Sequence, residues 1–130
     1  MRPAIGLLLL GLLPGCGPYL AARTTPPPLR TAVLDDVAQT IELSAGVALA
    51  FSCDNWTAMP CQNAKARTDD AAVAQVYAAH LNQLSHDWGP GQRGPRVETG
   101  FVIAGLKPGK TTLRVSSDDG EAVFAVEVVP

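Results

Sequence analysis

Short runs in which apolar and polar residues alternate are the feature that most limits how this chain can fold. Near its end, TTLRV (111–115) is followed by the polar segment SSDDG (116–120) and then by EAVFAVEVV (121–129). Alternation with a period of two residues is typical of a half-buried strand, and Asp-Gly between two such runs is a strong hairpin signal. The segment VAQTIELSAGVALAF (37–51) alternates on both sides of Gly46 and predicts two more strands joined by a turn or a bulge.

The segment DDAAVAQVYAAHLNQL (69–84) carries a different pattern. Its apolar residues have helical spacing behind Thr68, which could cap a helix, and they are Val73, Val76, Tyr77, Leu81 and Leu84. Local propensity alone therefore favours a helix here.

Two glycine-rich stretches superficially resemble nucleotide-binding motifs. GLKPGKTT (105–112) has its first glycine one position too close for a phosphate-binding loop, and a strand pattern follows where that loop needs a helix. GPGQRG (89–94) has neither a strand directly before it nor a helix after it. We therefore expect no nucleotide and no other cofactor, and KPGK is predicted to be a turn in which Gly109 adopts a positive φ.

The first residues carry an export signal. Arg2 precedes an apolar run from Ala4 to Leu13, which is too short to span a bilayer and fits a secretory signal. LLPGC (12–16) resembles the lipobox of bacterial lipoproteins, and this resemblance implies a signal peptide over 1–15 and a lipid on Cys16. The membrane is then the first partner, and Gly17 after the cysteine favours delivery to the outer membrane. The alternative is a plain signal peptide with an incidental cysteine.

The segment 16–35 contains three consecutive prolines and little that could pack. It is predicted to be an extended tether, which leaves 36–130 as one small folded domain. The chain has ten basic residues, one of them in the signal, against twelve acidic residues. Nucleic acid is excluded as a partner because no basic stripe could neutralise its phosphates.

Cys53 and Cys61 remain as a pair once Cys16 carries a lipid. In an oxidising compartment a disulfide is the default, and closing so short a loop stabilises a fold by roughly 2–3 kcal/mol. A metal site is the competing interpretation, but two cysteines with no histidine nearby offer too few ligands for zinc.

Three segments resemble bacterial immunoglobulin-like domains of the group 2-like, intimin/invasin type. They are ARTDDAAVAQV (66–76), GFVIAGLKPGKTTLRV (100–115) and AVFAVEVV (122–129). The resemblance implies an all-β immunoglobulin-like sandwich of about seven strands, with 73–77 as a strand despite its helical spacing. The chain departs from this pattern at the loop 54–60 and at an insertion over 78–99, for which a short helix near 78–84 is one option.

No catalytic constellation is visible in the sequence. Ser85, His86 and Asp87 are contiguous, whereas the members of a hydrolytic triad converge from separate parts of a fold. His80 and His86 supply only two ligands for a metal. The chain is therefore predicted not to be an enzyme and to hold no metal.

Three aspartate doublets, at 35–36, 69–70 and 118–119, lie at predicted strand ends. A sandwich could gather them at one end to bind Ca²⁺. The simpler interpretation, which we favour, is that they form turns and are solvated.

Trp56 and Trp88 lie in the two departures from the family pattern. The favoured interpretation is that each packs into the core beneath its own loop. The alternative is that both are exposed and form, with His86 and Arg93, a patch that binds a protein or a glycan.

These observations predict a lipid-anchored envelope protein whose immunoglobulin-like module is structural or adhesive. The alternative is a periplasmic inhibitor or accessory subunit that binds a soluble enzyme through the insertion.

Overall fold

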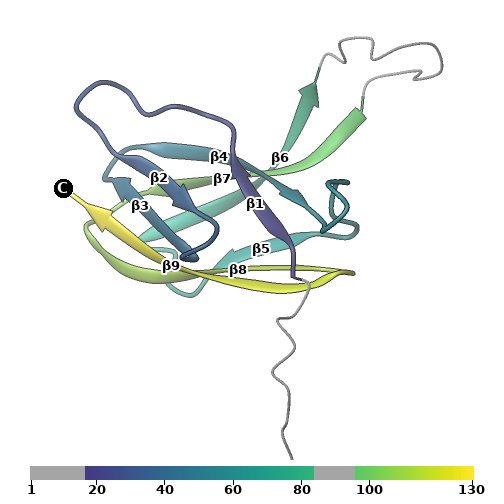
Figure 1. Cartoon of the computed structure of the whole chain (residues 1–130). Helices are drawn as coiled ribbons and strands as arrows, with labels where there is room; N and C mark the ends of the chain where they lie inside the picture. Colours follow the sequence, from purple (N-terminus) through teal and green to yellow (C-terminus); the bar gives the residue numbers. More distant parts are fainter. Residues whose placement is uncertain (1–16, 84–95) are drawn as a thin grey trace, which may run out of the picture.

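The computed structural model describes residues 17–83 and 96–130 (Figure 1). These ranges contain nine strands: β1 (Tyr19–Ala22), β2 (Ala32–Asp35), β3 (Thr40–Ser44), β4 (Ala48–Asp54), β5 (Lys65–Thr68), β6 (Ala74–Gln83), β7 (Arg96–Gly105), β8 (Gly109–Ser117) and β9 (Gly120–Val129). Within the same two ranges, no helix is long and apolar enough to cross a membrane.

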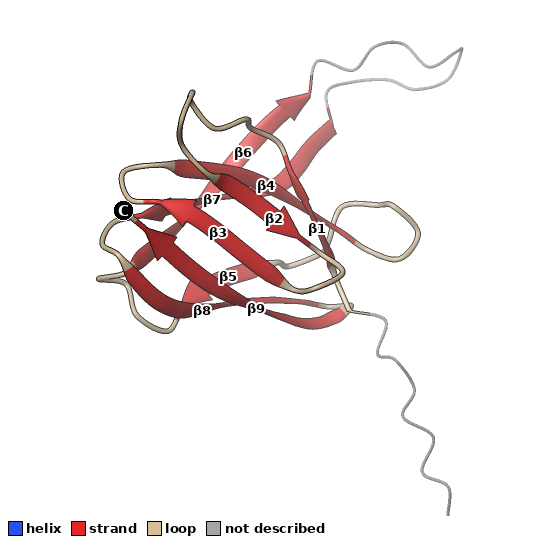
Figure 2. Cartoon of the chain, turned by 60° about the vertical axis from the view of Figure 1, so that its left-hand side comes forward, coloured by secondary structure: helices blue, strands red, loops and turns tan. Residues whose placement is uncertain are grey.

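The strands form two sheets that pack face to face (Figure 2). One sheet has the order β1-β4-β7-β6, and the other has the order β2-β3-β9-β8-β5. If β1 is equated with strand A and β4 to β9 with strands B to G, the first sheet has the order ABED of an immunoglobulin domain. The second sheet then contains the order GFC. The predicted all-β, immunoglobulin-like sandwich is confirmed, with the two short strands β2 and β3 added at the edge of the second sheet.

All pairings are antiparallel except that of β3 with β9, where Ile41 lies opposite Val126. The predicted C-terminal hairpin is confirmed as β8 and β9, with Leu113 opposite Phe124. Gly46, between β3 and β4, has a φ of 80°, and Gly109, at the start of β8, has a φ of 157°. Both glycines therefore occupy backbone conformations that other residues rarely adopt, as predicted for the KPGK turn.

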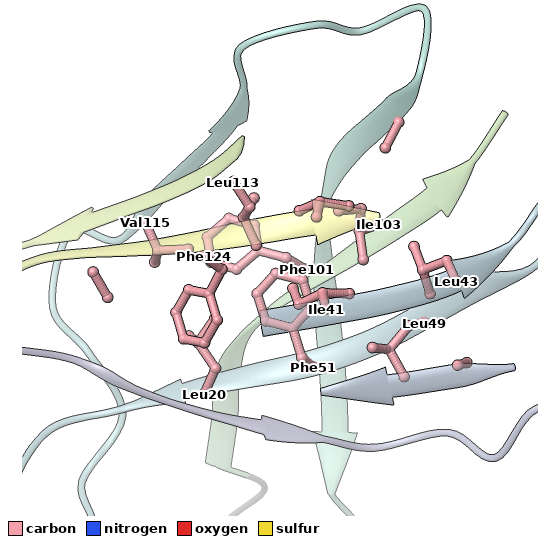
Figure 3. Packing of buried hydrophobic residues seen from close by; sticks show 14 of the residues in the cluster. Leu20, Ile41, Leu43, Leu49, Phe51, Phe101, Ile103, Leu113, Val115 and Phe124 are labelled. Carbon is pink, nitrogen blue, oxygen red and sulfur yellow. The ribbon is translucent and has the colours of Figure 1, made fainter. Parts of the chain in front are cut away.

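The core lies between the sheets because each strand turns its alternate apolar residues inward (Figure 3). Phe51 of β4 and Phe101 of β7 pack with ring centroids 5.7 Å apart. The largest fully buried apolar side chains are Phe51, Phe124, Ile41, Leu43, Leu49, Ile103, Leu113, Val115 and Val126. Burying one such side chain contributes about 1.5–3 kcal/mol, so this layer supplies most of the driving force for folding.

The helix favoured by local spacing in 69–84 is wrong where the structure describes this segment. Residues 74–83 form β6, which pairs with β7 from Ala74 opposite Gly105 to Gln83 opposite Arg96. Backbone pairing along this whole length outweighs a weak local propensity for helix. The expected insertion over 78–99 is corrected in the same way: 78–83 and 96–99 extend the two strands, and 84–95 lies outside the described residues.

The tether predicted over 16–35 is also corrected. Tyr19–Ala22 is β1, at the edge of one sheet, and Ala32–Asp35 is β2, at the edge of the other. Leu20 is buried in the core, and its N–H donates to Asp36 Oδ1 at 2.9 Å. The proline-rich run lies in the connection that crosses between the sheets, so the folded unit begins well before residue 36. Strands of four residues are too short for their alternation to be recognised in a sequence.

Candidate functional site

A disulfide bond closes the base of the loop between β4 and β5. Cys53, in β4, forms a disulfide with Cys61, and both are buried in the core. The Cys61 N–H also donates to the Cys53 carbonyl at 3.0 Å. The predicted disulfide is confirmed, and residues 54–60, which it encloses, are called the disulfide loop below.

Asn55 organises the disulfide loop from within. Its Oδ1 accepts hydrogen bonds from the Thr57 N–H at 3.0 Å, the Thr57 hydroxyl at 2.6 Å and the Met59 N–H at 3.1 Å. The Asn55 N–H donates to the Met59 carbonyl at 2.7 Å, and the Ala58 N–H donates to the Asn55 carbonyl at 2.9 Å. Asparagine often stabilises turns in this way, so the loop has a defined conformation independent of any partner.

The apolar side chains of this loop face solvent. Trp56 is 67% exposed and Met59 is 55% exposed. The prediction that Trp56 packs into the core beneath its loop is therefore wrong. The buried disulfide already occupies the core at the base of the loop, and Asn55, rather than an apolar side chain, holds the loop together.

The disulfide loop lies at the end of the sandwich where the described chain begins. Tyr19 at the start of β1 pairs with Asp54, the last residue of β4. Figures 1 and 2 both show the start of β1, the β4–β5 connection and the β8–β9 turn at this end, away from the C-terminus. We call it the N-terminal pole.

Residues just after the disulfide loop tie this pole together. The Asp118 N–H donates to the Gln62 carbonyl at 3.1 Å, and the Asn63 side-chain amide donates to Asp118 Oδ2 at 2.8 Å. The connection after Cys61 is thus fixed to the β8–β9 turn. The base of the disulfide loop is consequently held both by the disulfide and by a second turn of the pole.

The other candidate binding residues fall outside this description. Ser52 of β4 lies level with Gly100 of β7, which pairs with Ala79 of β6, so β6 ends and β7 begins toward the N-terminal pole. Trp88, His86 and Arg93 belong to 84–95, which lies outside the described residues. The four-residue patch therefore stays a prediction, of which the structure places only Trp56.

A serine, an arginine and an aspartate meet on the outer face of β4. Ser52 Oγ accepts a hydrogen bond from Arg23 Nε at 3.0 Å and donates one to Asp54 Oδ2 at 3.3 Å, while Arg23 and Asp54 approach to 3.9 Å. Ser52 is fully buried, so no substrate can reach its hydroxyl. This group ties the start of the β1–β2 connection to the sheet, and sequence inspection missed it because Arg23 is 29 residues from Ser52.

The aspartate doublets do not assemble into one site. Asp36 accepts from the Leu20 N–H and Asp118 from Asn63 at the N-terminal pole, whereas Asp69 bonds Arg114 of β8 at 3.2 Å. Within 17–83 and 96–130, no three histidine, cysteine, aspartate or glutamate side chains are grouped as metal ligands. This arrangement favours local, turn-forming roles over a shared calcium site.

Arg114 is the one described residue with a clearly shifted pKa. Its hydrogen bonds to Asp69, helped by the charge of Asp69 and by Glu121 at 3.8 Å, raise the pKa of the guanidinium above its ordinary value. An arginine is charged at every pH a cell experiences, and these contacts favour its charged form further. Arg114 acts as a fixed cation on the outer face of the second sheet and cannot take part in proton transfer.

Comparisons with known proteins give only distant similarities. No protein-family model matches the chain, and no curated protein matches its sequence. Among solved structures, it is similar to domains 4 and 5 of the S-layer protein SbsC, with 15% identity over 83% of this chain and a TM-score of 0.47. Domains 5–6 of SbsC give 19% identity over 81% of this chain and a TM-score of 0.48. The chain spans 55% and 45% of the length of these two solved chains.

Proposed function

We propose that this protein is a non-catalytic, immunoglobulin-like module of the bacterial cell envelope, anchored by a lipid on Cys16. Its role is structural or adhesive, and the disulfide loop is its contact surface. The lipobox-like sequence LLPGC supports the anchor, and Gly17 after the cysteine supports delivery to the outer membrane. The segments that resemble intimin/invasin-type domains support an adhesive module on the sandwich.

The observation that carries the proposal is that the base of an exposed aromatic loop pairs with β1, the strand nearest Cys16 in the sequence. Trp56 is 67% exposed on a loop whose base pairs with β1. Tyr19, the first residue of β1, comes three positions after Cys16. Three extended residues span at most about 10 Å, so a lipid on Cys16 would hold the N-terminal pole directly against the bilayer. The module would therefore be held close to the membrane surface.

A non-catalytic role agrees with the polar groups that the structure describes. Ser52 is buried beneath Arg23 and Asp54, and Arg114 is fixed between two carboxylates. Each of these groups is occupied by a structural contact. In contrast, the exposed Trp56 has the size and the mixed apolar and polar character that anchor residues at interfaces share.

The anchor is tested by labelling the full chain with palmitate in a bacterial host. Wild-type protein should incorporate label and fractionate with membranes, whereas Cys16→Ser should be unlabelled and soluble after export. The double variant Cys53→Ala/Cys61→Ala is the control, because it keeps Cys16 as its one cysteine and should still be labelled. Equal labelling of wild type and Cys16→Ser would refute the anchor.

A pull-down from detergent extracts tests the role of the module. We expect envelope components among the material captured with the wild-type protein. Capture of one stoichiometric soluble enzyme, with nothing else, would instead identify an inhibitor or accessory subunit.

A further inference from the structure

We propose that the disulfide loop docks onto the lipid bilayer and places Trp56 and Met59 in the headgroup region of the membrane. This inference rests on the proposed anchor at Cys16 and names the partner of the contact surface. The lipid would then be one of two attachments, and the second would fix the orientation of the sandwich on the membrane.

The position of the loop follows from strand pairing. Tyr19 lies opposite Asp54 and Leu20 lies opposite Cys53, so the loop leaves β4 beside the point where the chain enters β1. Paired strands are about 5 Å apart, which is half the reach of the three residue steps from Cys16 to Tyr19. A lipid inserted in the bilayer therefore brings the base of the loop to the membrane surface.

Four of the nine exposed large apolar residues in the described part of the chain lie at this pole. Trp56 is 67%, Met59 55% and Tyr19 50% exposed. Val37, which is 97% exposed, follows Asp36, whose carboxylate accepts the hydrogen bond from Leu20 of β1. Tryptophan and tyrosine are enriched where membrane meets water, because one part of each ring is apolar and the other carries a hydrogen-bond donor.

The loop is already in a defined conformation before it meets a membrane. The disulfide joins its ends, and Asn55 Oδ1 accepts three hydrogen bonds within it. A preformed loop loses little conformational entropy on binding, so even a small apolar contact contributes to affinity. The lipid anchor adds to this effect, since it keeps the loop at high effective concentration beside the bilayer.

The charges of the pole favour apolar insertion over attraction to anionic lipids. Asp54 lies 3.9 Å from Arg23, Asp36 accepts from the Leu20 N–H, and Asp118 accepts from Asn63. These three carboxylates have local partners, and the charges named here are mostly acidic. They are unlike the clusters of lysines and arginines by which proteins recognise anionic headgroups. The part of the membrane that fits the disulfide loop is the uncharged boundary between headgroups and acyl chains.

The test uses the full, lipidated chain with Trp88→Phe, which leaves Trp56 as the single tryptophan. The protein is reconstituted into phosphatidylcholine vesicles, with or without lipids brominated near the headgroup. We expect emission at shorter wavelength than in detergent-free Cys16→Ser/Trp88→Phe protein, and loss of emission when the brominated lipids are present. Flotation of the vesicles shows in the same sample that the protein is attached.

The matched control places the single tryptophan at another position and keeps the lipid on Cys16. Tyr77 is 50% exposed on β6 and lies opposite Val102 in the sheet, away from the pole. The variant Trp56→Phe/Trp88→Phe/Tyr77→Trp should float with the vesicles and keep its emission. Equal quenching of both reporters would overturn the proposal, because it would show an unoriented association.

Three other outcomes would overturn docking of the disulfide loop on lipid. Unquenched Trp56 in protein that floats with the vesicles would overturn loop docking and leave the anchor standing. A shift in Trp56 emission only after an envelope protein is added would assign the loop to a protein partner and overturn docking on lipid. Protein that fails to float would refute the anchor at Cys16, and with it the inference that depends on it.

Discussion

The disulfide loop and the β7–β8 turn lie at opposite ends of the sandwich, and different interactions fix their conformations. The disulfide loop is held by its own disulfide and by Asn55, and it presents Trp56 and Met59 to solvent. The β7–β8 turn, at 106–108, is held by the fit of its flanking glycines against the core. The disulfide loop therefore presents a large aromatic side chain on a self-contained loop, whereas the β7–β8 turn, in which Leu106 is 49% exposed, is fixed by close packing at Gly105.

Gly105 shows how tightly the β7–β8 turn is packed. A Cβ at this position would lie 3.0 Å from the Ser44 carbonyl oxygen and 3.1 Å from Val128 Cγ1. The backbone of Gly105 also bonds both Val47, at 2.9 Å, and Gly46, at 2.8 Å. Gly105, at the end of β7, thus packs against residues of β3 and β9, and no side chain fits at this position.

The two regions differ in whether their residues specify the fold or are available for binding. At the β7–β8 turn, a change of one methyl group should disturb the core. At the tip of the disulfide loop, removing a whole indole should leave the fold intact. The following predictions test this contrast by measuring the free energy of unfolding.

Among changes in the loop and the turn, the largest effect is expected for Cys53→Ala/Cys61→Ala. Loss of the cross-link should lower the free energy of unfolding by about 2–3 kcal/mol, because the unfolded chain regains the entropy of the opened loop. Urea unfolding followed by circular dichroism measures this change, with Cys16→Ser in both proteins to remove the lipid. A loss below that of Asn55→Ala would show that hydrogen bonds, rather than the disulfide, hold the loop.

Gly105→Ala should lower the free energy of unfolding by about 1–3 kcal/mol, the usual cost of overpacking. The control is Gly46→Ala, where an added Cβ meets nothing within 4 Å and only the φ of 80° resists the substitution. We expect a smaller loss there, about 1 kcal/mol. If Gly46→Ala were the more damaging of the two, backbone conformation rather than close packing would specify this end of the fold.

These two turns also show how far the sequence alone predicts the fold. The strands β8 and β9 were predictable because their alternation is long and their turn residues are specific. The positive φ of Gly109 was predictable from KPGK. The role of Gly105 was not, because its close approach to Ser44 and Val128 depends on strands distant in sequence.

The remaining errors have related physical causes. Local spacing favoured a helix over β6, because pairing with β7 is not visible in local spacing, whereas the family resemblance correctly implied a strand over 73–77. β1 was assigned to a tether because its single core residue, Leu20, leaves too weak a pattern in four residues. At the candidate site, cysteine pairing followed from compartment and count, whereas the exposure of Trp56 depends on hydrogen bonds of Asn55 that no sequence pattern indicated.

Asn55→Ala should lower the free energy of unfolding by about 1 kcal/mol, since its partners in this exposed loop can turn to water. The larger consequence is flexibility: amide hydrogens of Thr57 and Met59, which bond Asn55 Oδ1, should exchange faster. Hydrogen exchange by mass spectrometry of the loop peptide measures this, and Val33→Ala, which removes an exposed side chain of β2, is the control. Unchanged protection in Asn55→Ala would mean that the disulfide alone fixes the loop.

The smallest effect on stability is expected for Trp56→Ala. Truncating a buried tryptophan costs about 3–5 kcal/mol, whereas a surface substitution usually stays within about 0.5 kcal/mol. Because Trp56 is 67% exposed, the free energy of unfolding should change by no more than the surface value. Phe101→Ala, which truncates a buried aromatic of β7, is the contrasting variant and should unfold at much lower urea. A large loss in Trp56→Ala would place the indole in the core after all, and the disulfide loop would then be a structural closure like the β7–β8 turn.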